Sequence, residues 1–137
     1  MKFSAATLCN YAQEQSGTLT VVSAGITRLL RSDYPAPLGI MVAMLLEAPE
    51  HVVRTPQELR AFVEREDGER LVGLMAAFQL TEVQGADPGE LLIIPSVIDL
   101  RHIPLPAPGR YQIALQIMGH EGQEQVLSFR ALLAADS

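Results

Sequence analysis

The last third of the chain alternates apolar and polar residues, and this pattern constrains the fold more than any other feature. After Pro108-Gly109-Arg110, apolar side chains occupy every second position, at Tyr111, Ile113, Leu115 and Ile117. Successive side chains of an extended chain point to opposite faces, so a period of two is typical of a half-buried β-strand. A second apolar segment, residues 125–133, follows a short turn with two glycines. The two segments predict a closing β-hairpin around residues 119–122.

Other segments rich in β-branched and apolar residues are separated by turn formers. They predict further strands over residues 3–12, 19–30, 40–46, 71–80 and 91–100, and one more that begins near residue 59. Gly25 predicts a bulge in the second of these strands, and Pro95 predicts that the strand it interrupts is an edge or bulged strand. Strands and helices do not alternate along the chain as a parallel sheet would require. Seven to eight strands in 137 residues therefore predict one all-β domain over residues 1–137, an antiparallel β-sandwich with an immunoglobulin-like layout.

Residues 55–64 fit two structures. The run Thr55-Pro56-Gln57-Glu58 has the residue types of a helical capping box, which favours a short helix. Against this, Leu59, Ala61 and Val63 alternate, and Asp67-Gly68 is a strong hairpin signal between two apolar segments. The pattern favours a strand that pairs through the Asp67-Gly68 turn with residues 71–80, and the helix is the alternative.

The strand predicted at residues 40–46 is apolar at both parities, which is typical of a strand covered on both faces. Hydrophobic residues make up 48% of the chain and charged residues 19%, so apolar surface is in excess for a small sandwich. Another segment of the chain or a second subunit must cover the extra face, and we expect a subunit. The predicted interface residues are Met41, Ala43, Leu45, Leu91 and Ile93.

Residues with reactive or metal-binding side chains do not form a recognisable motif. Cys9 has no histidine near it in sequence, so a buried core thiol is the favoured interpretation. The three histidines, His51, His102 and His120, lack the close spacing of a metal site. The acidic run Glu64, Glu66, Asp67 and Glu69 is interleaved with Arg65 and Arg70, which indicates a solvated hairpin tip rather than a calcium loop. We expect no cofactor, no metal and no enzymatic activity.

The segment Asp99-Leu100-Arg101-His102 is the remaining polar cluster of interest. An acid, a cation and an imidazole lie close together, which favours a surface ion pair at a strand end. Two alternatives stay open. Arg101 or His102 orients a small apolar ligand held between the sheets, or Asp99 and His102 join a distant histidine in a hydrolase or metal enzyme.

Charge and composition limit the class of partner. The net charge is −6 and the Lys and Arg residues are scattered along the sequence, which argues against nucleic acid. No apolar run approaches the roughly 20 residues of a membrane helix, and residues 1–4 do not begin a secretory signal. A single cysteine excludes an internal disulfide. We therefore expect a cytoplasmic protein that does not associate with membranes.

Residues 3–12, with the sequence FSAATLCNYA, are followed by a glycine turn and a strand rich in Val, Ile and Thr. This opening resembles an uncharacterised family of short bacterial proteins, defined only as a domain of unknown function. Pro108-Gly109-Arg110-Tyr111 and the alternation after it are similar to the final hairpin of that family and to the last strands of immunoglobulin-like modules. The region from Leu59 to Leu80 resembles a strand, an Asp-Gly turn and a strand in the family. The resemblance implies a β-sandwich and carries no catalytic residues.

These observations together predict a protein-binding or assembly module without catalytic activity. The expected partners are a second copy of the chain, forming a dimer, and another protein. A β-sandwich that binds a small apolar ligand is the main alternative.

Overall fold

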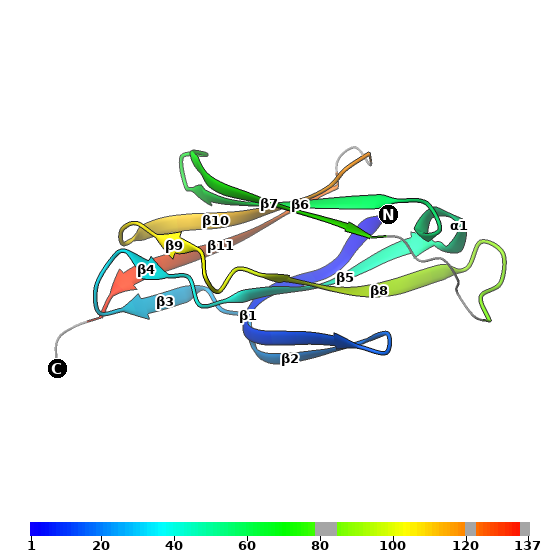
Figure 1. Cartoon of the computed structure of the whole chain (residues 1–137), viewed down its shortest axis with the longest axis horizontal. Coiled ribbons are helices and arrows are strands. Elements are labelled where there is room, and N and C mark those ends of the chain that lie inside the picture. The colour runs from blue at the N-terminus through cyan, green and yellow to red at the C-terminus, as the bar shows by residue number, and fades with distance from the viewer. Residues whose placement is uncertain (79–84, 120–122, 135–137) are drawn as a thin grey trace.

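The computed structural model describes residues 1–78, 85–119 and 123–134, and two β-sheets facing each other dominate it (Figure 1). The first sheet has the spatial order β2 (Thr18–Ala24), β1 (Lys2–Gln15), β5 (Met41–Pro49) and β8 (Leu91–Asp99). The second has the order β3 (Arg28–Arg31), β11 (Glu124–Leu133), β10 (Gly109–Ile117), β6 (Gln57–Arg65) and β7 (Arg70–Phe78). Two short strands, β4 (Ala36–Pro37) and β9 (Pro104–Leu105), pair with each other. The chain is thus an all-β sandwich, as predicted.

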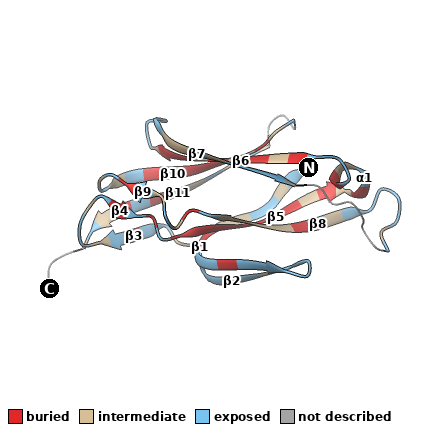
Figure 2. Ribbon diagram, viewed as in Figure 1, coloured by how far each residue is buried: buried red, intermediate tan, exposed pale blue. Residues whose placement is uncertain are grey.

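The core fills the space between the two sheets. Val42, Met44 and Leu46 of β5 belong to the same buried cluster as Ile113 and Leu115 of β10. Figure 2 shows buried residues along β5, β6 and β10, the strands in the middle of the sandwich. The predicted alternation of β10 is confirmed, because its odd-numbered side chains from residue 111 to residue 117 are all buried.

The predicted strand over residues 19–30 is two strands in different sheets. β2 ends at Ala24, and Gly25 follows with φ +82°, a left-handed conformation that glycine adopts without strain. The Ile26 N–H donates to the Leu8 carbonyl, after which β3 pairs with β11 in the second sheet. Gly25 therefore marks a change of sheet and not the predicted bulge. The β3–β11 pairing is parallel, so the sandwich is not purely antiparallel, and eleven strands form in the described residues.

Residues 57–65 form strand β6, which confirms the strand interpretation over the helix. A short helix, α1 (Glu50–Val53), lies just before them, and Thr55 closes its end: its hydroxyl donates to the Val52 carbonyl at 2.6 Å. The Gln57 side-chain amide donates to the same carbonyl at 2.9 Å. The Thr-Pro sequence thus ends a helical turn and does not begin one. Within the described residues, this four-residue helix is far too short to span a membrane.

The two predicted hairpins also form. Gly68 has φ +93° in the turn between β6 and β7, and the Glu69 N–H donates to Asp67 Oδ1 at 2.9 Å. β10 and β11 pair antiparallel from Gly109 opposite Ala131 to Gln116 opposite Glu124. Residues 120–122 of the second turn, and residues 79–80 at the end of the predicted strand 71–80, lie outside the described residues.

The β1–β2 hairpin forms a partial third layer. β1 pairs with β5 through its first half and with β2 through its second half, and the hairpin lies below β5 and β8 in Figure 1. A second buried cluster joins this hairpin to the outer face of the first sheet. Its members are Cys9, Ala12, Met41 and Ala43, with Leu19, Val21 and Val97 packed around them.

Candidate binding groove at the sandwich edge

The sandwich has an open side where the end strands of the two sheets face each other. Among the described residues, β8 pairs only with β5 and β7 pairs only with β6. A groove of about 550 Å³ runs along this side. Its lining comes from Ile93–Ile98 of β8, Ala76 and Ala77 of β7, Leu59 of β6, and Glu14 and Gly17 of the β1–β2 hairpin. The free edge of β8 therefore lies between the tip of this hairpin and β7.

The side chains of β8 divide between the core and solvent. Leu92 and Ile94 pack on the main core, whereas Leu91 and Ile93 are 59% and 52% exposed. Pro95 lacks an N–H group and its ring fixes the backbone, and an edge strand tolerates such a residue because no further strand needs its donor. The prediction that this is an edge strand is confirmed. The large aliphatic side chains of Leu91 and Ile93 are exposed to solvent beside the groove.

In the structure, the β1–β2 hairpin covers Met41 and Ala43, in place of the predicted second subunit. They are 5% and 1% exposed because the β1–β2 hairpin packs on them, and Leu45 is half-buried. The expectation that a partner reaches Met41 and Ala43 is therefore corrected: the chain itself covers this part of β5. Of the five predicted interface residues, Leu91 and Ile93 remain exposed and close to the groove.

Arg101 and His102 do not line the groove. Arg101 forms a two-pronged ion pair with Asp99, with Nε 3.0 Å from Oδ1 and Nη2 2.9 Å from Oδ2. Its guanidinium also lies 5.8 Å from the centroid of the Tyr11 ring. His102 is exposed. The interpretation of this segment as a surface ion pair fits the geometry, and the Nε and Nη2 groups of Arg101 are already bonded to Asp99.

The Asp99–Arg101 pair leads to a testable pH effect. Hydrogen bonds from the Arg101 side chain and backbone lower the pKa of Asp99 from 3.8 to about 2. A carboxylate with a lowered folded pKa stabilises the fold above its unfolded pKa, and this contribution is lost as the pH falls through the folded value. We expect an NMR titration to show Asp99 ionising near pH 2 in the wild type and at a higher pH in Arg101→Gln, although the backbone N–H of residue 101 still donates to Asp99 in this variant. The variant Arg60→Gln should leave the Asp99 pKa unchanged, and an unaltered value in Arg101→Gln would contradict the assignment.

Residues 4–130 match the model of a family of unknown function, DUF6941. The chain belongs to this family. A comparison with curated proteins finds no match. The resemblance noted in the sequence, to an uncharacterised domain, is thus confirmed at the level of a family without an assigned function.

The reactive side chains of this DUF6941 chain are dispersed. Cys9 is fully buried, its thiol lies 3.5 Å from the Met41 carbonyl, and burial raises the pKa of the thiol. His51 is exposed, and His120 lies outside the described residues. Within the described residues, no group of three His, Cys, Asp or Glu side chains is arranged to hold a metal ion. The buried core thiol predicted for Cys9 is confirmed.

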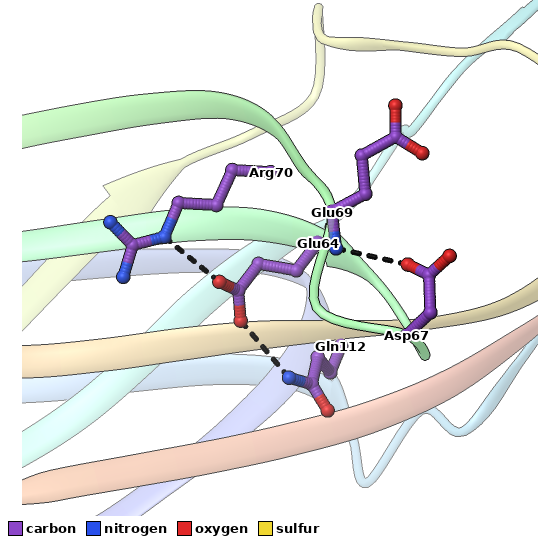
Figure 3. A network of polar contacts seen from close by, with 5 residues as sticks. All are labelled: Glu64, Asp67, Glu69, Arg70 and Gln112. Atoms are coloured by element: carbon purple, nitrogen blue, oxygen red, sulfur yellow. Dashed lines mark hydrogen bonds and ion pairs between the residues drawn. The ribbon is translucent and has the colours of Figure 1, made fainter.

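A polar network around Glu64 links three strands of the DUF6941 chain, which the sequence did not indicate (Figure 3). Glu64 is 7% exposed; its carboxylate accepts from Arg70 Nε and from Gln112 Nε2, each at 3.0 Å. The Arg70 guanidinium also lies 3.8 Å from the centroid of the Phe62 ring, which covers Gly73 on the neighbouring strand. The acidic run was interpreted as a solvated tip, which holds for its exposed members Glu66, Asp67 and Glu69. Glu64 instead fastens β6 to β7 and β10.

Proposed function

We propose that this protein is a non-catalytic binding module that holds an extended segment of a partner protein along the free edge of β8. The observation that carries the proposal is the groove itself, in which apolar side chains flank a strand edge that no other strand in the described part of the chain pairs with. An exposed strand edge is a row of N–H and C=O groups that a further strand can satisfy, and on β8 this row lacks one donor, at Pro95. Strand addition of this kind gains affinity from main-chain hydrogen bonds and specificity from pockets for alternate side chains.

The dimensions of the groove suit such a segment. The lining residues 93–98 are continuous along β8, and six residues of a strand span about 20 Å. A partner segment of five or six residues would place every second side chain toward the lining residues Leu59 and Ala76. Exposed Ile93 and Leu91 would then lose contact with water against the same segment. The net charge of −6 supports a protein partner rather than a nucleic acid.

A cytoplasmic location and an immunoglobulin-like layout are parts of this proposal. The free, buried thiol of Cys9 fits a reducing compartment, and two packed sheets with a closing hairpin fit the layout. A second copy of the chain is the alternative occupant of the groove, because β8 could pair with β8 of another molecule.

Ile93→Glu tests the proposal. Peptides of six to eight residues selected from a random display library on the wild-type chain should bind it and perturb the amide NMR signals of residues 93–98. Ile93→Glu adds a charge where the peptide must be desolvated, so we expect affinity to fall about tenfold or more. Binding is measured by titration calorimetry.

Val126→Glu is the matched control, since Val126 is 41% exposed on β11 of the other sheet and does not line the groove. It should leave peptide affinity unchanged. Peptides that bind Ile93→Glu as tightly as the wild type would place the site elsewhere. A dimer in light scattering that Ile93→Glu dissociates would replace the partner protein with a second copy of the chain.

A further inference from the structure

Three arginines lie in a row on the outer face of the second sheet. Arg110 of β10 is directly opposite Arg130 of β11, and Arg130 is paired in turn with Arg28 of β3. Directly paired residues project from the same face of a sheet, and the adjacent Phe129 and Leu29 are buried in the core on the other face. Neighbouring strands are about 4.8 Å apart, so the three Cα atoms lie within roughly 10 Å. β3, β11 and β10 are grouped at the left of Figure 1.

This arrangement concentrates positive charge in an acidic protein. The chain has 10 Lys and Arg residues against 16 Asp and Glu, yet three of the ten are direct neighbours. Like charges opposite each other on a sheet destabilise the pairing. Arg110 has an acidic neighbour, Glu66, at 3.6 Å, but both side chains are about two-thirds exposed, where ion pairs contribute little. In the described part of the chain, the Arg28 and Arg130 side chains make no ion pair or hydrogen bond.

The row borders a cleft. A hollow of about 350 Å³ is lined by all three arginines together with Thr27, Glu66, Gln112 and Ser128. Ser128 lies opposite Gln112, one step of the same face along the β10–β11 hairpin from the row. The Gln112 amide donates to Glu64, whereas the hydroxyl of Ser128 makes no hydrogen bond to the described part of the chain. The cleft thus offers three guanidinium groups and a hydroxyl to a ligand.

We propose that this cleft binds a small polyanion with two or more linked phosphoryl groups, that is, an oligophosphate. Guanidinium groups present pairs of N–H donors whose geometry matches phosphate oxygens. The three arginines provide more positive charge than one carboxylate balances, so a ligand with several negative charges gains most from the site. A bound polyanion also removes the repulsion between the paired arginines.

The spacing of the arginines favours phosphate over an acidic peptide. Side chains on one face of an extended peptide repeat at about 7 Å, so only two carboxylates would fall within the row. Linked phosphoryl groups place more charge within the same length and within a cleft of about 350 Å³. The proposal is independent of the groove beside β8, because the two sites share no lining residue.

Inorganic triphosphate is the probe, titrated into the full chain by calorimetry and by amide NMR at salt near 0.1 M, where exposed charges are partly screened. We expect binding with signal changes centred on residues 28, 110, 128 and 130. Arg130→Gln removes the middle of the row and should weaken binding about tenfold or more. Without ligand this variant should unfold at the same temperature as the wild type or at a higher one, since it relieves repulsion.

Two further variants sharpen the test. Arg60→Gln makes the same charge change on β6, opposite Gln116 and away from the row, and should leave affinity unchanged. Glu66→Gln removes a competing carboxylate and should tighten binding. Failure of triphosphate to bind, or equal weakening by Arg60→Gln and Arg130→Gln, would overturn the site. Inorganic phosphate binding as tightly as triphosphate, or hexaglutamate binding more tightly, would overturn the oligophosphate assignment.

Discussion

Met41→Glu is expected to destabilise the fold by about 4 kcal/mol or more, because it buries a carboxylate directly opposite another carboxylate, Asp99 of β8. Met41 is 5% exposed and packs with Cys9, Ala12 and Ala43 beneath the β1–β2 hairpin. A domain of this size has a free energy of unfolding of roughly 5 to 15 kcal/mol, so this loss is a large part of the total. The variant should unfold at much lower urea concentration, as followed by far-UV circular dichroism.

Met75→Glu is the matched control for this result. Met75 is 66% exposed on β7, so the same change of residue should alter the free energy of unfolding by only about 0.5 kcal/mol. Met41→Leu keeps the volume and should cost less than about 1.5 kcal/mol. If Met41→Glu instead gives a fully stable protein of smaller solution mass, then a subunit and not the hairpin covers β5.

The cover of β5 shows where sequence patterns stop being informative. Apolar residues at both parities of residues 40–46 correctly predict a strand buried on two faces, since that information is in the strand itself. Which part of the chain lies on the second face depends on the bend of β1, where one strand pairs first with β5 and then with β2. Bending of this kind is a tertiary effect and leaves no periodic signal.

Glycine and turn residues predicted the structure correctly where their effect was confined to residues adjacent in sequence. Asp67-Gly68 predicted its hairpin because the turn and both strands are adjacent in sequence. Gly25 was recognised as an interruption, but its consequence, a change of sheet, depends on the pairing of β3 with β11 about a hundred residues later. The capping-box pattern at Thr55 failed because the same hydroxyl closes the helix before it.

The groove beside β8 and the arginine row also differ in how far the sequence predicts them. Leu91 and Ile93 were predicted as interface residues because the strand carrying them breaks the alternation of a solvated sheet. The arginine row was not predicted, since residues 28, 110 and 130 are scattered in sequence and only the register of three strands brings them together. An uneven distribution of charge in space can therefore arise from a sequence in which cations are evenly spread.

Ile113→Ala is expected to cost about 2 to 5 kcal/mol, through lost burial and the cavity left behind. Ile113 is fully buried at the centre of β10, opposite Val63 of β6 on one side and Leu127 of β11 on the other. Two neighbouring strands therefore flank the truncated side chain, and a closely packed sandwich does not collapse fully to fill the space. Urea unfolding should show the midpoint shifting with little change in slope.

A graded series separates packing from hairpin propensity. Ile113→Val removes one methylene group and should cost about 0.5 to 1.5 kcal/mol. Val126→Ala, at a position 41% exposed on the partner strand, tests the β-propensity of the same hairpin and should cost well under 1 kcal/mol. If Val126→Ala were as costly as Ile113→Ala, the hairpin would be stabilised by its own strand preferences. A large difference would show that the alternation of β10 determines stability through the core it faces.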